Sequence, residues 1–87
     1  MKKVIVSIYD EKSELFSNPA IANTVNDARR SFESLVNDNN SMPGKYPSDF
    51  KLYELGSFSD SSGEISVYDI PKLVVSGVQC LSVKKES

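Results

Sequence analysis

The chain of 87 residues has no histidine, no tryptophan and a single cysteine. Histidine is the side chain that most often acts as a general acid or base near neutral pH, so its absence argues against catalysis. One cysteine cannot form an internal disulfide, and without histidine the chain has no plausible set of zinc ligands. Small secreted domains usually depend on disulfides for stability. The sequence therefore predicts a cytosolic protein without a metal.

Long apolar runs and the motifs of common enzymes are also missing. No stretch approaches the roughly 20 apolar residues that cross a bilayer. The apolar run at residues 4–8 is shorter than the core of a signal peptide, which needs about 7–15 residues. There is no glycine-rich phosphate loop and no Gly-x-Ser-x-Gly nucleophile elbow. We expect no targeting segment, no membrane association, no catalytic residue and no cofactor.

Length and composition indicate one small domain. The chain is 39% hydrophobic with a net charge of −2, which is compatible with folding around a modest core. We expect a single domain over residues 1–83 and a frayed tail over residues 84–87. Cys80 lies in an apolar stretch and is expected in the core.

The clearest strand is at residues 3–10, where Val4, Val6 and Ile8 alternate with a second set of side chains that includes Tyr9. A tight turn follows, and residues 13–18 are expected to pair back as a second strand. Pro19 limits how far that strand extends. The first part of the chain therefore predicts a β-hairpin.

The best helix is at residues 24–37, with Thr24 placed to cap its first turn and Asp27 three residues later. Its apolar residues recur in steps of three and four and draw one stripe, formed by Val25, Ala28, Phe32, Leu35 and Val36. Two prolines and a glycine predict an irregular loop at residues 42–47.

A second hairpin is expected after that loop. Phe50–Ser59 reads as a strand that is apolar on both sides, which favours a central position in the sheet. Residues 60–63 form the loop, with Gly63 suited to a left-handed conformation, and residues 64–69 return as a short strand. Residues 71–83 fit either a helix or a strand, with a mild preference for extended structure.

These elements predict an α+β fold with a small antiparallel sheet of four to five strands. Two hairpins flank one amphipathic helix, which packs on one face of the sheet. Small antiparallel sheets often complete themselves by pairing their edges, and a modest core gains from extra burial. A homodimer is therefore expected.

Aromatic residues on the strands, with basic residues near them, suggest a surface for single-stranded nucleic acid. Bases stack on aromatic rings while cations follow the phosphates. The candidate nucleic-acid-binding residues are Arg29, Arg30, Lys45, Tyr46, Lys51 and Tyr53. The acidic balance of the chain counts against this role unless the cations gather on one face. A protein–protein interaction module is the alternative, and it fits the charge better.

Three segments together resemble a known family. They are SIYDEKSELFSNP at residues 7–19, NDARRSFESLVND at 26–38 and KYPSDFKLYELGSFSDSSGEI at 45–65. In this order they resemble the small nonstructural protein of gokushovirus-type microviruses, the open-reading-frame-5 family of single-stranded DNA phages. Tyr46 stands where that family often has histidine, and Ser48 where it often has glutamate.

The resemblance implies a non-enzymatic accessory protein of phage DNA replication that acts in the cytoplasm of the infected bacterium. Binding of single-stranded DNA is the activity usually suggested for the family. By position, Arg30 falls on the arginine of the family's helix, and Lys45, Phe50 and Tyr53 fall on its Lys-x-Pro and Leu-Tyr motifs. Under the alternative, the protein would engage a phage replication protein, a host protein or a capsid precursor.

Overall fold

The strand expected at the start of the chain forms and belongs to an antiparallel sheet with the other strands of the described chain. The computed structural model describes residues 1–81, so Val83 and the tail expected at residues 84–87 lie outside it. The strands, in chain order, are β1 (Lys2–Asp10), β2 (Leu15–Phe16), β3 (Ala20–Ala22), β4 (Phe50–Ser59) and β5 (Ile65–Ser76). The helical elements are α1 (Val25–Val36), α2 (Met42–Lys45), the 3-10 turn η1 (Pro47–Asp49) and α3 (Gly77–Leu81).

The sheet confirms the predicted fold class. Its order is β2-β1-β4-β5, and β3 pairs with the same edge of β1 as β2 does. The two expected hairpins are β1–β2 and β4–β5, although β2 covers only Leu15–Phe16 and not all of residues 13–18. β4 is central, as its apolar character on both sides predicted. Pro19 separates β2 from β3, because proline has no N–H to continue the ladder.

Helix α1 begins and ends where its sequence pattern predicted. The Thr24 hydroxyl accepts a hydrogen bond from the backbone N–H of Asp27 at 3.0 Å and so caps the first turn. The apolar stripe of α1 packs on one face of the sheet. Cys80 of α3 joins the same core, as expected. The core consists of Val6, Ala28, Phe32, Val36, Phe50, Leu52, Val75 and Cys80.

Two local predictions were wrong. Residues 42–47 are not an irregular loop: they contain α2 and the start of η1. The Ser41 hydroxyl caps α2 by accepting from the Gly44 N–H at 2.9 Å, and Pro43 sits in the first turn, where no N–H is needed. The returning strand is also longer than residues 64–69, since β5 continues to Ser76. The segment from residue 71, which fitted either a helix or a strand, is therefore divided: it is strand up to Ser76, and the helix α3 follows.

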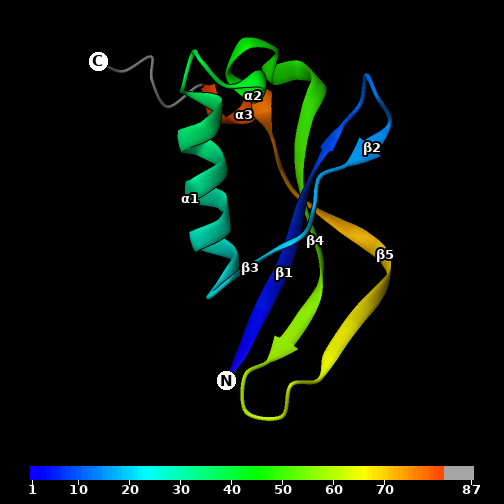
Figure 1. Cartoon of the computed structure of the whole chain (residues 1–87). Coiled ribbons are helices and arrows are strands. Elements are labelled where there is room, and N and C mark those ends of the chain that lie inside the picture. Colours follow the sequence, from blue (N-terminus) through cyan, green and yellow to red (C-terminus); the bar gives the residue numbers. More distant parts are fainter. Residues whose placement is uncertain (82–87) are drawn as a thin grey trace.

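The helices leave one face of the sheet without a helical cover in the described chain. In Figure 1, α1 runs along one side of the sheet, and α2 and α3 lie together at its upper end. β5 bends near its middle (Figure 1), where residues 68–71 of β5 lie opposite the single residue Leu55 of β4. The face away from α1 is the natural place for a functional surface, because a sheet face without a second layer is free to bind a partner.

Candidate nucleic-acid interface

The face of the sheet away from α1 is defined by the register of the strands. Residues that pair across antiparallel strands point to the same side, and Val6, Ile8 and Leu52 point toward α1. The alternate residues form four rows across the other side. These rows are Phe16–Tyr9–Lys51–Ser76, Ser7–Tyr53–Leu73, Ile21–Ile5–Gly56–Val67 and Lys3–Phe58–Ile65. We call this side the open face.

The open face is unusually apolar for the outer side of an antiparallel sheet. Such a side normally carries polar residues, because it faces water. Here its four rows contain no carboxylate, and their only charged residues are Lys3 and Lys51. The open face is therefore suited to an apolar or aromatic partner that carries little positive charge.

One end of the open face holds an aromatic cluster. The ring centroids of Tyr9 and Phe16 are 4.7 Å apart, those of Phe16 and Tyr53 are 5.6 Å apart, and those of Tyr9 and Tyr53 are 6.1 Å apart. The rings are tilted or edge-on to one another, the geometry that aromatic quadrupoles prefer. Ile70 and Pro71 from the bend of β5 complete an open groove of about 360 Å³. We call these five residues the aromatic end.

The nearest cation on the open face is already paired. Lys51 lies in the same row as Tyr9, and its ammonium group contacts the carboxylate of Glu11 in the β1–β2 turn. Lys51 is mostly covered while Glu11 is about half exposed, so the pair lies at the protein surface. Surface ion pairs of this kind are weak, usually below about 1 kcal/mol. Lys51 is thus held beside the aromatic end and remains able to exchange its partner.

A polar contact fastens the bend of β5 to β4. The Tyr68 hydroxyl donates to the Glu54 carboxylate at 2.6 Å, and the Lys72 ammonium lies 4.4 Å from the centre of the Tyr68 ring. The hydrogen bond to Glu54, aided by desolvation, raises the pKa of Tyr68 above its ordinary value. The bend places Ile70 and Pro71 in the groove, so this contact supports the aromatic end.

The raised pKa of Tyr68 predicts a stability effect at alkaline pH. A group whose pKa is raised on folding stabilises the protein below its unfolded pKa, which is near 10 for tyrosine, and this contribution is lost as pH rises through the folded pKa. Wild type should therefore exceed Tyr68→Phe in unfolding free energy by about 1 kcal/mol at neutral pH. The difference should shrink as pH rises above about 10. Urea unfolding at a series of pH values measures it, and a difference that grows with pH would contradict the assignment.

The six residues predicted to contact nucleic acid do not all lie together. Arg29 and Arg30 are exposed on α1, in the layer on the opposite side of the sheet from the open face. The Arg29 side chain lies 3.7 Å from the Glu33 carboxylate on the next turn. Lys45 is the last residue of α2 and Tyr46 follows it.

The remaining two predicted residues, Lys51 and Tyr53, do lie on the open face. Tyr46, by contrast, borders a different groove, which Asp10 and Asp49 also line. Carboxylates there disfavour phosphate. Sequence reasoning did not select Phe16, whose place beside Tyr9 follows from the hairpin register. The alternation of residues 3–10 had already put Tyr9 on the side away from Val6.

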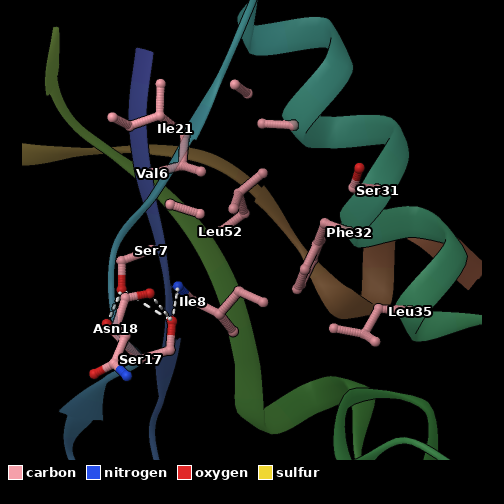
Figure 2. Close-up of a pocket in the computed structure, with 13 residues that line it drawn as sticks. Val6, Ser7, Ile8, Ser17, Asn18, Ile21, Ser31, Phe32, Leu35 and Leu52 are labelled. Atoms are coloured by element: carbon pink, nitrogen blue, oxygen red, sulfur yellow. Dashed lines mark hydrogen bonds between the residues drawn. The ribbon is translucent and has the colours of Figure 1, made fainter. Parts of the chain in front are cut away.

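A second hollow lies between α1 and the sheet (Figure 2). It has a volume of about 280 Å³, with Phe32 and Leu35 of α1 facing Ile8 and Leu52 of the sheet. Where this hollow reaches the open-face side of β1, the Ser7 hydroxyl donates to the Ser17 carbonyl at 2.7 Å. No charged side chain lines this hollow. It is a gap in the packing beneath α1 with no charged group to attract a phosphate.

The described chain contains no cluster of three or more potential metal ligands. No helix within residues 1–81 is long and apolar enough to cross a membrane. What these residues do form is a small α+β domain with an open, aromatic sheet face. The family model of the phage ORF5 protein matches residues 3–80, and the chain therefore belongs to that family. No curated protein and no solved structure gives a significant match.

Proposed function

We propose that this phage protein is a non-enzymatic accessory factor of DNA replication that binds single-stranded DNA at the aromatic end of the open face. It would act in the cytoplasm of the infected bacterium. The observation that carries the proposal is the cluster of Tyr9, Phe16 and Tyr53 beside a groove on a sheet face without carboxylates.

Stacking would supply most of the affinity. A base that stacks on a protein aromatic ring contributes about 1–3 kcal/mol, and the contact tolerates any sequence because every base has a π-face. Phe16 is 44% exposed, so part of its ring is free for a base. The groove bounded by Ile70 and Pro71 offers apolar walls to the same base. Binding without strong sequence preference follows from this chemistry.

Electrostatic attraction would add little. Lys51 can move from Glu11 to a phosphate, and Lys3 lies at the far end of the open face. For single strands, the slope of log K against log salt is about −0.7 for each phosphate neutralised. One or two contacts predict a shallow slope, roughly −0.7 to −1.4. This fits a chain of net charge −2 better than a site built on many cations would.

A titration of fluorescent oligo-dT by anisotropy at low salt tests the proposal. Wild type should bind, and Phe16→Leu should weaken binding by about tenfold, because leucine keeps the apolar contact but cannot stack. Tyr46→Leu is the matched control: Tyr46 is exposed but lies off the open face. Glu11→Gln, which frees Lys51, should tighten binding modestly.

Two outcomes would contradict the proposal. One is no binding by wild type at tens of micromolar protein, and the other is equal loss in Phe16→Leu and Tyr46→Leu. Unfolding curves for each variant establish that the fold is retained. Because Phe16 is part-exposed in a two-residue strand, its replacement by leucine should leave most of the stability intact.

A protein partner is the second candidate function. The observation that favours it is the number of exposed aliphatic residues on the open face, which exceeds the number of cations there. The partner would be a phage replication protein, a host protein or a capsid precursor. Phe16→Leu separates the two candidates, since an apolar protein contact tolerates leucine and base stacking does not.

A further inference from the structure

The end of the open face remote from the aromatic cluster is aliphatic. Ile21, Ile5 and Val67 form one row with Gly56 between them, and Phe58 and Ile65 lie in the next row. Val67 is 73% exposed and Ile65 is 61% exposed, although neither contributes to the core. We call these residues the aliphatic end. DNA binding does not explain this end, because its exposed residues are Ile21, Ile65 and Val67, which offer no ring for a base to stack on.

The edge of β5 is poorly suited to pairing with another sheet. Its bend at residues 68–71 interrupts the ladder, and Pro71 lacks an N–H to donate. Bulges and prolines are the devices by which natural proteins prevent edge pairing. A dimer joined through β5 edges is therefore disfavoured, and the apolar face is the better surface for self-association.

We propose that a second copy of this chain packs face to face on the aliphatic end, about a two-fold axis. Gly56 has no side chain between Ile5 and Val67 in its row, and Phe58 lies in the adjacent row. A two-fold axis between these two rows places Phe58 of each copy over Gly56 of the other. The same apolar patch then forms both sides of the contact, as a two-fold interface requires.

The available area matches a modest dimer. Taking on the order of 200 Å² for a fully exposed large side chain, the aliphatic end presents roughly 400 Å² of apolar surface per copy. Interfaces are about 56–65% apolar, so the whole footprint is roughly 700 Å² per copy. Standard interfaces bury about 800 Å² per partner. Lys3 ends the row of Phe58, and Asp60 and Glu64 lie in the loop between β4 and β5, so the charge lies beside the apolar rows, as it does at the rim of interfaces.

Such a dimer would change how the protein binds nucleic acid. The dimer proposal itself does not depend on nucleic-acid binding. The aromatic end lies outside the proposed contact, so each dimer would present two stacking sites. Two linked sites raise the affinity for a strand long enough to reach both, and leave the affinity for a short strand unchanged.

Sedimentation equilibrium from micromolar to hundreds of micromolar protein tests the proposal. Wild type should fit a monomer–dimer equilibrium. Val67→Lys should raise the dimer dissociation constant by about tenfold or more. Val78→Lys is the matched control, because it makes the same change at an exposed valine in α3, away from the open face. Both valines are exposed, so circular dichroism should show both variants folded.

Three results would overturn the dimer: a monomeric wild type over the whole range, a dimer that Val67→Lys leaves intact, or equal weakening by Val67→Lys and Val78→Lys. Oligo-dT titration of the same variants distinguishes the dimer proposal from the DNA-binding proposal. Binding of a short oligonucleotide by monomeric Val67→Lys, with wild-type affinity, would support DNA binding whatever the fate of the dimer.

Discussion

Phe32→Ala should lower the free energy of unfolding by about 3–5 kcal/mol. Phe32 is 2% exposed and sits at the centre of the stripe by which α1 packs on the sheet. Its loss removes the transfer free energy of the ring and leaves a cavity beneath α1, next to the hollow that Phe32 already borders. A domain of this length is stable by about 4–13 kcal/mol in total, so most of that margin could disappear.

Urea unfolding followed by circular dichroism measures the effect. Phe16→Ala is the matched control, since Phe16 is part-exposed and its loss should cost about 1 kcal/mol. If Phe32→Ala does not fold, Phe32→Leu provides the same test, with a smaller loss of unfolding free energy at the same site. A destabilisation by Phe32→Ala no larger than that by Phe16→Ala would contradict the packing of α1.

Gly56→Ala should destabilise the protein by about 3 kcal/mol. A Cβ atom at Gly56 would lie 2.1 Å from the Ser66 carbonyl oxygen and 2.9 Å from the Val67 Cα. These are backbone atoms, which cannot rotate away as a side chain can, so β4 and β5 would have to separate.

Gly63→Ala distinguishes this steric effect from a general intolerance of glycine replacement. Gly63 has a φ of 81° in the hairpin loop, but a methyl group there would have no other atom within 4 Å, so its replacement should cost only about 1 kcal/mol of backbone strain. Amide hydrogen exchange should report lost protection in β5 for Gly56→Ala alone. Wild-type protection of β5 in that variant would refute the close approach of β4 and β5.

The elements with strong local signals could be predicted from the sequence. The alternation in β1, the cap and stripe of α1 and the left-handed Gly63 each depend on neighbouring residues, and all three were confirmed. The helix α2 was missed because its prolines and glycine suggested a loop, whereas the Ser41 cap and the position of Pro43 make one helical turn stable.

The candidate site was harder to predict because it depends on register. Tyr9, Phe16 and Tyr53 come together only because β2 and β4 pair on opposite edges of β1. Composition could identify strand aromatics with basic neighbours, but not that Arg29 and Arg30 would lie in the layer on the far side of the sheet. The length of β5 could not be predicted from the sequence either, because its bend breaks the alternation that marks a strand.

Photocrosslinking of a 5-iododeoxyuridine oligonucleotide tests most directly whether the aromatic end stacks on bases. Peptide mass spectrometry would locate the crosslinked residues. The stacking geometry predicts crosslinks at Tyr9, Phe16 or Tyr53, lost in competition with unlabelled oligo-dT, while the exposed Tyr46 stays unmodified. Crosslinks at Tyr46 equal to those at the aromatic end, or none at the aromatic end under saturating oligonucleotide, would contradict the proposed function.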